Sequence, residues 1–305
     1  MKIRLEAAIA KGRSVIAGGR VADYIPELGK ADPKALAVAC CGMDGAVIAS
    51  GDTDTLISIQ SISKVVSLAA ALLECGEEKV FSAVGVEPTA DPFNSIMRLE
   101  MRAPHRPQNP LINSGAIVVL SLLPYTESRS RFEAVLDLTR KMCANTSILA
   151  NETVYLSEKA TSDRNRSLAY FLRSTGSLKG DIEDILDSYF HQCAIACTVS
   201  DLAVMGATLA NDGVNPVSRE KVLPRRISLA LRSLMATCGL YDGSGEFALR
   251  VGIPAKSGVG GGIMAAAPGK MGLGTVGPSL DPKGNSIGGM HVLEELSREL
   301  GFRVL

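Results

Sequence analysis

Residues 35–50 read Ala35-Leu-Ala-Val-Ala-Cys-Cys-Gly-Met-Asp-Gly-Ala-Val-Ile-Ala-Ser50. Two apolar runs flank the segment Gly42-Met-Asp-Gly45, which is typical of two strands joined by a glycine-containing turn. A further short strand is predicted over residues 55–59. The first sixty residues are therefore expected to supply strands.

A helical region follows these strands. Residues 60–74 carry apolar side chains on nearly every side of a helix, which predicts a central, buried helix that ends at Cys75-Gly76. Further helices are predicted over residues 130–142, 166–173, 181–192, 200–210 and 226–237.

Strand character returns after residue 247. Residues 251–253, 262–267 and 271–276 are expected to be strands, 281–284 a turn and 290–300 a last amphipathic helix. The pattern predicts an α/β (α+β) fold, in which an antiparallel sheet built from N- and C-terminal segments is flanked by helices. Residues 1–60 with 245–305 would form the sheet lobe and 61–244 a mainly helical lobe, with the active site between them.

Composition and charge exclude several classes of protein. Among 305 residues, 46% are hydrophobic and 21% charged, which excludes a largely disordered chain. Lys+Arg equals Asp+Glu at 32 each and no Lys/Arg-rich run occurs, so no nucleic-acid partner is expected. No apolar stretch has the length of a membrane span, and charged residues replace the apolar core of a signal peptide near the N-terminus. We therefore expect a cytoplasmic protein without a membrane partner.

The possible metal ligands do not form a metal-binding pattern. The seven cysteines lack Cys-x-x-Cys spacing and the three histidines are scattered. We interpret the cysteines as small buried hydrophobic residues in a reducing compartment, and we expect no metal site.

One glycine-rich segment matches a nucleotide-binding pattern by its letters alone. Gly272-Leu-Gly-Thr-Val-Gly277 has the spacing of a dinucleotide-binding loop. A pyrophosphate there would require a helix that begins at the motif, and Pro278-Ser-Leu-Asp-Pro282 disfavours one. We interpret the match as accidental.

The tetrapeptide Ser-x-x-Lys occurs twice. Ser218-Arg-Glu-Lys221 lies in a polar connection, where a solvated, protonated lysine cannot act as a base. Ser61-Ile-Ser-Lys64 instead opens the most apolar predicted helix, so the Ser61 hydroxyl and the Lys64 amine lie on one helical face and can touch. Burial favours the neutral amine, and the helix N-terminus points N–H groups at an oxyanion beside Ser61. The alternative is that Ser61 only caps the helix and Lys64 reaches solvent.

A second lysine motif supports the catalytic interpretation. Lys256-Ser-Gly258 precedes the glycine-rich run Gly258-Val-Gly-Gly-Gly262, which lets a strand pass close to a ligand. An early Ser-x-x-Lys with a late Lys-[Ser/Thr]-Gly is the pair used by serine β-lactamases and penicillin-binding proteins. The pair favours a serine acyl-transfer enzyme.

Several longer segments extend this similarity. They are Tyr24-Ile-Pro-Glu27, Gln60-Ser-Ile-Ser-Lys64, Asn109-Pro-Leu-Ile-Asn-Ser-Gly-Ala-Ile117, Ser157-Glu158 with Arg164-Asn165, Asp187-Ser-Tyr-Phe-His-Gln-Cys193, Gly239-Leu-Tyr-Asp-Gly243 and Lys256-Ser-Gly-Val-Gly-Gly-Gly-Ile263. In order and approximate spacing they resemble the serine-dependent glutaminases over about residues 24–264. Ser114 stands where the family pattern suggests Ala, and Ala194 where it suggests Ser. Neither departure touches a residue to which we assign chemistry.

The resemblance implies hydrolysis of L-glutamine to L-glutamate and ammonia, without metal or organic cofactor, by a homodimer or homotetramer. It implies that Ser61 is the nucleophile and Lys64 its base. The residues that it implies for the substrate pocket are Tyr24, Ser61, Asn113, Glu158, Asn165, Tyr189, Tyr241 and the backbone of Val259.

The proposed reaction assigns a task to each group. The N–H groups of Ser61 and Val259 could hold the tetrahedral oxyanion. Tyr189 or Tyr241 could relay a proton to the departing amine, and the sequence favours neither. Glu158 is the natural partner of the substrate's α-amino group.

The α-carboxylate of the substrate requires donors, which Asn113, Asn165 and the Tyr24 hydroxyl can supply. Three of the implied residues also have non-catalytic interpretations: Glu158 as a surface charge, Tyr189 as a core aromatic and Asn113 as a turn residue.

Two other functions remain as alternatives. One is a β-lactamase or another penicillin-binding-like amidase on the same scaffold, for which the charged N-terminus offers no periplasmic signal. The other is a scaffold that has lost catalysis and serves as a regulatory or oligomerisation module, although every side chain that the mechanism requires is present.

Overall fold

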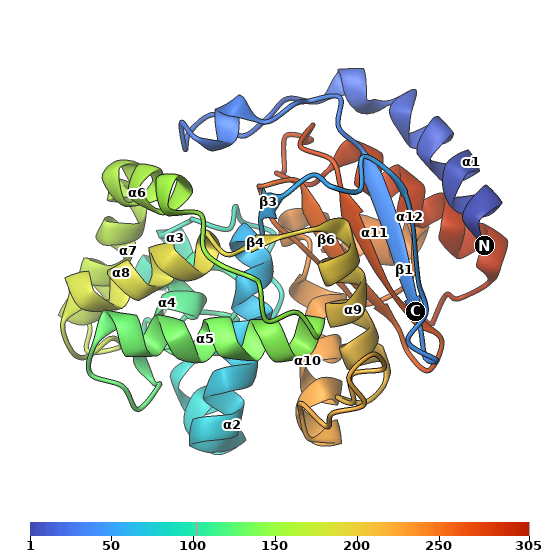
Figure 1. The fold of residues 1–305 in the computed structure, drawn as a ribbon. Coiled ribbons are helices and arrows are strands. Elements are labelled where there is room, and N and C mark those ends of the chain that lie inside the picture. Colours follow the sequence, from blue (N-terminus) through green and yellow to red (C-terminus); the bar gives the residue numbers. More distant parts are fainter. Residues whose placement is uncertain (102, 305) are drawn as a thin grey trace.

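The computed structural model describes residues 1–101 and 103–304. Its main sheet has five strands in the order β2-β1-β7-β6-β5, and each neighbouring pair is antiparallel. The strands are β1 (Ala37–Gly42), β2 (Val47–Gly51), β5 (Ala255–Ser257), β6 (Gly262–Ala267) and β7 (Met271–Val276). Because β1 pairs with β7, the two ends of the chain share one sheet, as the sequence predicts (Figure 1).

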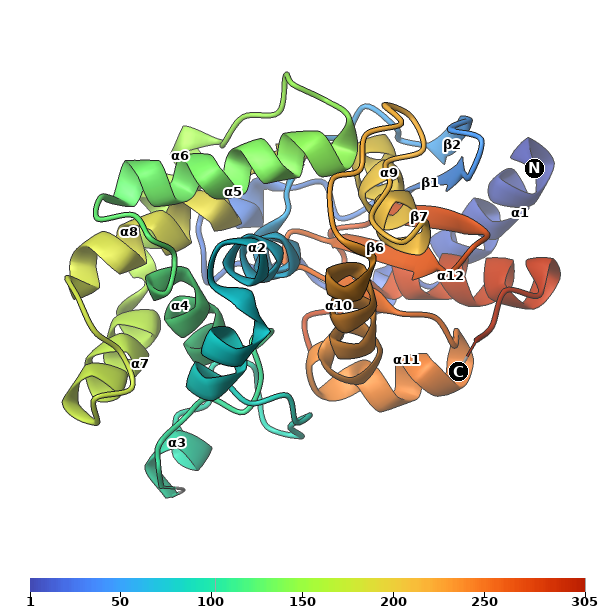
Figure 2. The same ribbon diagram turned by 90° about the horizontal axis from the view of Figure 1, so that it is seen from below.

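Both faces of this sheet are covered by helices. The covering helices are α1 (Lys2–Arg13) and α12 (Ile287–Leu300) on one face and α9 (Val199–Ala210) on the other. Side chains alternate along β1, so Val38 and Cys40 join the hydrophobic cluster of α1 and α12, whereas Ala39 and Cys41 join the larger core that includes α9. Figure 2 shows the sheet between these layers.

The glycine-rich segment on β7 has a packing role. A Cβ atom at Gly272 would lie 1.9 Å from the Ala207 nitrogen and 2.1 Å from the Ala203 carbonyl oxygen. Glycine therefore lets the backbone of α9 approach the strand directly. Residues 277–286 form a loop between β7 and α12, so no helix begins within this described segment to support a dinucleotide site.

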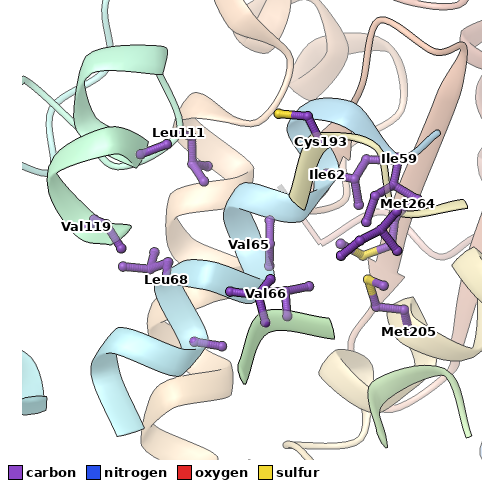
Figure 3. Packing of buried hydrophobic residues seen from close by; sticks show 14 of the residues in the cluster. Ile59, Ile62, Val65, Val66, Leu68, Leu111, Val119, Cys193, Met205 and Met264 are labelled. Atoms are coloured by element: carbon purple, nitrogen blue, oxygen red, sulfur yellow. The ribbon is translucent and has the colours of Figure 1, made fainter. Parts of the chain in front are cut away.

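A long helix runs through the middle of the helical region. This helix is α2 (Ser63–Ala83), and it packs against α4 (Asn113–Ser121), α5 (Ser128–Cys143) and α10 (Arg225–Cys238). Figure 3 shows Val65, Val66 and Leu68 of α2 among buried side chains that include Leu111 and Val119. Residues 63–72 of α2 are all buried, which explains why this part of the helix carries apolar residues on nearly every side.

Most predicted helices are confirmed to within three residues at each end. Besides α5, α9, α10 and α12, they include α7 (Asp163–Ser174) and α8 (Ile182–Cys193). Four strands were also expected correctly: β1, β2, β6 and β7.

One expectation about secondary structure was wrong, and two were met only in part. The helix that begins at Ser63 breaks at Gly76, whose φ of 77° and ψ of 163° are not helical, but a second helical segment follows directly as far as Ala83. Residues 251–253 form no strand, because Gly252 has φ 72° and Pro254 lacks a backbone donor; β5 starts at Ala255. The strand expected over 55–59 shortens to β3 (Ile57–Ser58).

The short strand β3 pairs with β4 (Ala196–Cys197) in a separate two-stranded sheet. This pairing ties the segment before Ser61 to the segment after α8. It therefore joins two parts of the candidate site that are far apart in the sequence.

Five helices were not predicted. They are α1, α3 (Met97–Met101), α4, α6 (Glu152–Thr161) and α11 (Ser244–Arg250). Nearly all of α4 is buried, so its sequence has no amphipathic pattern to detect. The start of α6 did carry a detectable pattern, since the Asn151 side chain accepts hydrogen bonds from the N–H groups of Thr153 and Val154.

Three further observations concern the described residues as a set. No helix among them is both long and apolar enough to span a bilayer. The seven cysteines are free thiols, and all except Cys75 are buried. Among the residues that the structure describes, no group of three or more His, Cys, Asp or Glu side chains is arranged to hold a metal ion.

Candidate active site

Ser61 lies in the tight turn η3 (Gln60–Ile62), directly before α2 begins at Ser63. Gln60 has a positive φ of 46°, and the neighbouring Ile59 N–H donates to the Ile195 carbonyl at 2.8 Å. A positive φ costs a non-glycine residue on the order of 1 kcal/mol, so tertiary contacts must hold this turn. Ser61 is 7% exposed, and it lines a pocket at the N-terminal end of α2.

Lys64 lies in the first turn of α2 and is completely buried. Its Nζ donates to Asn113 Oδ1 at 2.5 Å. Burial lowers the pKa of Lys64 to about 8, opposed by the negative charges of Cys193 and Glu158 when these groups are ionised. A fraction of the amine is therefore neutral near neutral pH, as a general base requires, and this fraction grows as pH rises through about 8.

The structure does not contain the direct Ser61–Lys64 hydrogen bond that the sequence suggested. Among the described residues, the lysine amine bonds to Asn113, whereas Ser61 lies close enough to Tyr241 to oppose the rise in the pKa of its hydroxyl. The two groups share the start of one helix, but each has a separate partner.

The pocket beside Ser61 is small and partly open to solvent, with a cavity volume of about 80 Å³. Its lining includes seven of the residues implied by the resemblance: Tyr24, Ser61, Asn113, Glu158, Asn165, Tyr189 and Val259. Lys64 and Tyr241 are not part of the lining and reach the site through their contacts with Asn113 and Ser61. The size and polarity of the lining suit a small polar molecule.

Glu158 lies on α6 and is 4% exposed, so it is not a surface charge. Burial raises its pKa to about 7, while a hydrogen bond from Gln60 Nε2 to Glu158 Oε2, 3.2 Å long, opposes that rise. A buried carboxylate whose one amide donor among the described side chains is Gln60 is suited to a cationic ligand group.

Two amides form a chain that leads from the base into the pocket. Since Asn113 Oδ1 accepts from Lys64, its Nδ2 is directed towards Asn165, and it donates to Asn165 Oδ1 at 2.8 Å. Asn113 begins α4 and Asn165 lies in α7, so the chain joins three helices at the pocket. Asn113 is therefore more than a turn residue.

The loop that carries Val259 packs closely against the chain that precedes Ser61. A Cβ atom at Gly258 would lie 2.4 Å from the Ile59 carbonyl oxygen, and one at Gly260 would lie 2.2 Å from that of Ser58. Glycines on both sides thus bring Val259, which is 5% exposed, into the wall of the pocket.

The two candidate tyrosines occupy different positions. Tyr189 lies on α8 and lines the pocket, and burial raises its pKa well above the usual value. Tyr241 begins the turn η4 (Tyr241–Gly243) with φ 55°, and its hydroxyl donates to the Ser257 carbonyl at 3.4 Å. Burial also raises the pKa of Tyr241, opposed by hydrogen bonds with Ser61 and Ser257.

The side chains of the other two lysine motifs do not line the pocket. Ser218 and Lys221 are exposed in a loop, as expected. Lys256 lies on β5, completely buried, and donates to the carbonyl oxygens of Gly239 and Ser257. Burial, and secondarily the charge of Lys64, lowers the pKa of Lys256 well below its usual range.

The sequence analysis assigned no role to several residues that line the pocket. These are Ile25, Gln60, Phe93, Asn94, Thr161, Ser162, Arg164 and Cys193. Cys193 follows Tyr189 by four residues on α8, and this helical spacing could have indicated it. Phe93 and Asn94 come from a loop without a local pattern, held by hydrogen bonds from Asn113 N to Phe93 O and from Arg164 Nε to Asn94 O.

A buried serine at a helix N-terminus, a lysine of lowered pKa and a small polar pocket are typical of a serine acyl-transfer enzyme. The chain belongs to the glutaminase family, since the family model named Glutaminase matches residues 19–305. The expected family and fold are confirmed, and the protein is a hydrolase that acts on the side-chain amide of glutamine.

Individual relatives agree over the full length. Glutaminase 2 of Clostridium perfringens (strain 13 / Type A) is 51% identical over 304 residues, covering 100% of both chains. A glutaminase of Clostridium botulinum (strain Loch Maree / Type A3) is 50% identical over 300 residues, covering 98% of each.

Solved structures show the same architecture. A Bacillus glutaminase crystallised with 4.3 M NaCl superposes with a TM-score of 0.93 at 36% identity, covering 100% of this chain and 99% of that one. The Bacillus subtilis glutaminase in covalent complex with 5-oxo-L-norleucine, formed from 6-diazo-5-oxo-L-norleucine, gives a TM-score of 0.91 at 35% identity with the same coverage.

Proposed function

We propose that this glutaminase hydrolyses L-glutamine to L-glutamate and ammonia through a γ-glutamyl ester on Ser61, with Lys64 as the general base. The observation that carries the proposal is the complete burial of Lys64, one turn from Ser61, with its pKa lowered to about 8. Only an uncharged amine can accept the serine proton.

In the first half of the reaction, Ser61 Oγ attacks the side-chain amide carbon while its proton passes to Lys64. The carbon–nitrogen bond breaks, and the proton held by Lys64 is returned through a tyrosine hydroxyl to the departing nitrogen, so that ammonia leaves and Lys64 is neutral again. In the second half, a water molecule gives a proton to Lys64 and attacks the ester, which releases L-glutamate and restores the Ser61 hydroxyl. We assign the N–H groups of Ser61 and Val259 to the oxyanion in both halves.

We assign the proton transfer to the leaving nitrogen to Tyr241 rather than Tyr189. The side chain of Ser61, where the leaving group forms, lies close enough to Tyr241 to oppose the rise that burial causes in the pKa of its hydroxyl. Tyr189, on α8, lines the pocket and makes no hydrogen bond with Ser61 among the described contacts, and we assign it to substrate binding.

Substrate recognition uses the remaining pocket residues. Glu158 would bind the α-ammonium group, since its carboxylate is buried and has a hydrogen bond only from Gln60 among the described side-chain amides. Asn165 and the Tyr24 hydroxyl would bind the α-carboxylate, with Asn113 positioned between Asn165 and Lys64.

Covalent trapping tests this assignment. The purified protein is incubated with 6-diazo-5-oxo-L-norleucine, digested and examined by mass spectrometry. A stoichiometric adduct on Ser61, prevented by excess L-glutamine and lost in Ser61→Ala, is expected. An adduct on another side chain, such as Cys193 in the same pocket, would overturn the assignment of the nucleophile.

The Bacillus subtilis relative in covalent complex with a norleucine derivative supports the choice of reagent. A chromogenic β-lactam tested beside L-glutamine distinguishes the proposed glutaminase activity from that of a β-lactamase. Turnover of the β-lactam without ammonia release from glutamine would favour the β-lactamase-like alternative.

We also propose the two-lobe organisation, with residues 1–60 and 245–305 in one lobe and 61–244 in the other. Tyr24 and Val259 come to the pocket from the first lobe, whereas Asn113 and Glu158 come from the second. The arrangement is the one that we expect for a β-lactamase-like fold.

Location and assembly are further parts of the proposal. Seven free thiols suit a reducing, cytoplasmic compartment. The proposal that the protein is a homodimer or homotetramer rests on the family resemblance. Light scattering on the purified protein would measure the mass of the assembly directly.

A further inference from the structure

The side chain of Lys256 is buried next to Tyr241 and plays no part in the reaction described above. It extends from β5, the strand at one edge of the sheet, and its exposed fraction is 0%. Its Nζ lies 4.3 Å from the centroid of the Tyr241 ring. We propose that Lys256 is a positioning residue that holds the Tyr241 ring, and with it the Tyr241 hydroxyl, against Ser61.

The surroundings of Nζ suit an ammonium group. Nζ donates to the Ser257 carbonyl at 2.7 Å and to the Gly239 carbonyl at 2.9 Å, and the face of the Tyr241 ring offers a third electron-rich partner. An ammonium has three N–H groups and no lone pair, so it satisfies all three partners. Burial and the charge of Lys64 lower the pKa of Lys256, and these three contacts act in the opposite direction because each of them favours the ammonium form.

The position of Tyr241 requires such support. Its φ of 55° lies in the left-handed region, which a tyrosine adopts only when the surrounding structure imposes it. Lys256 Nζ and the Ser257 N–H both donate to the Gly239 carbonyl, two residues before Tyr241. The lysine thus anchors the backbone that leads into the strained residue as well as its ring.

The hydroxyl end of Tyr241 meets the reacting group. It donates to the Ser257 carbonyl at 3.4 Å, and it lies close enough to the Ser61 side chain for Ser61 to oppose the rise in its pKa. Phe93 contacts the same ring, with the two ring centroids 4.7 Å apart. Without Lys256, the ring would keep one aromatic neighbour but lose the charged contact that restricts its tilt.

The inference rests on the proposed function, because it assumes that Tyr241 moves a proton at Ser61. It predicts an effect on kcat rather than on KM. Glu158 and Asn165, which we assign to the charged ends of glutamine, make no hydrogen bond with Lys256 among the described contacts.

A double-mutant cycle tests the coupling. Lys256→Met, Tyr241→Phe and the double variant are purified, and kcat and KM for L-glutamine are measured for each. Lys256→Met should lower kcat by roughly 10- to 100-fold, part of the 10²- to 10⁴-fold typical of acid–base catalysis, and change KM by less than about threefold. In the Tyr241→Phe background, the same substitution should lower kcat by less than about twofold.

The cycle distinguishes positioning from a general structural role. If Lys256 only stabilises β5, its loss will lower kcat by the same factor with or without the Tyr241 hydroxyl, and the inference is overturned. Lys221→Met, on the exposed Ser-x-x-Lys segment, is the control for loss of a lysine and should leave kcat unchanged.

Folding is checked by circular dichroism and thermal unfolding. If Lys256→Met does not fold, Lys256→Gln replaces it in the cycle, because its amide can still donate to a carbonyl but carries no charge for the ring. If neither variant folds, Lys256 is a structural residue and the inference fails. Failure of the proposed function is separate and would appear as full activity in Ser61→Ala or Tyr241→Phe.

Discussion

Lys64 Nζ and Asn113 Oδ1 lie 2.5 Å apart, and this contact connects the proposed base with the substrate pocket. Asn113 donates in turn to Asn165 at 2.8 Å, and both amides line the pocket whereas the lysine is buried behind them. A substrate carboxylate bound at Asn165 would therefore influence Asn113, which is the hydrogen-bond partner of Lys64. The protonation of Lys64 and the binding of glutamine are expected to be coupled.

The rate of glutamine hydrolysis should rise with pH in two steps. Lys64 accepts a proton only when neutral, so kcat/KM should increase as pH rises through about 8, the pKa to which burial lowers this lysine. Glu158 must be ionised to bind the α-ammonium group, so KM should increase as pH falls below about 7. Ammonia release measured across both values checks the prediction, which a flat kcat/KM profile would contradict.

Two substitutions at Asn113 should shift the pKa of Lys64, seen as the rise of kcat/KM with pH (the Lys64 step), in opposite directions. Asn113→Asp places a carboxylate beside the amine, favours the ammonium and should raise the pKa of the Lys64 step by about 1–3 units. Asn113→Ala removes an acceptor that stabilises the ammonium and should lower it. Profiles of kcat/KM against pH for both variants provide the measurement, and equal shifts in one direction would disprove the contact.

Removing the nucleophile or the base should abolish turnover without unfolding the chain. Ser61→Ala and Lys64→Ala are expected to lower kcat by at least about 10³-fold, since each removes a group that acts only in the chemical steps. Ser218→Ala and Lys221→Ala, in the exposed tetrapeptide, are matched controls and should retain activity. Retention of kcat within twofold in Lys64→Ala would exclude that lysine as the base.

Glu158→Gln should weaken substrate binding more than it slows chemistry. The amide is nearly isosteric but carries no charge for the α-ammonium, so KM should rise by roughly 10- to 100-fold, equivalent to about 1.5–3 kcal/mol. Initial rates over a range of L-glutamine concentrations separate KM from kcat. An unchanged KM would remove Glu158 from the binding site.

Gly260→Ala should destabilise the loop that carries Val259. The new Cβ atom would lie 2.2 Å from the Ser58 carbonyl oxygen, and the resulting backbone shift is expected to cost about 1–3 kcal/mol of the free energy of unfolding. Gly245→Ala is the control, because a Cβ atom there meets nothing within 4 Å and the residue lies in α11. Urea denaturation should show the control unchanged or more stable by up to about 1 kcal/mol.

Local patterns in the sequence predicted much of the secondary structure but not all of it. Helices with one polar face, such as α5 and α8, were found because their apolar residues repeat with helical spacing. The buried α4 has no such contrast between faces and was missed. The Val-Gly-Ile segment before Pro254 resembled a strand by its apolar residues, but Gly252 turns the chain there.

The candidate site was predicted as a set of residues but not as a set of contacts. Seven of the expected residues line one pocket, and their segments span Tyr24 to Val259. The partner expected for Lys64 was Ser61, three residues away, whereas the structure pairs it with Asn113, 49 residues away. Sequence spacing identified which groups share a helix end and could not identify which groups share a hydrogen bond.

The sequence by itself determined the succession of strands and helices, the serine and lysine at the start of a buried helix, and the glutaminase family. These properties depend on residue spacing along one element, where backbone geometry sets which side chains are neighbours. Only the tertiary structure decided that Lys64 meets Asn113, that the Ser61 side chain meets Tyr241, and that Lys256 turns to the Tyr241 ring instead of the pocket. Those contacts join distant segments, and they depend on how burial, packing and hydrogen-bond satisfaction are met for the whole chain at once.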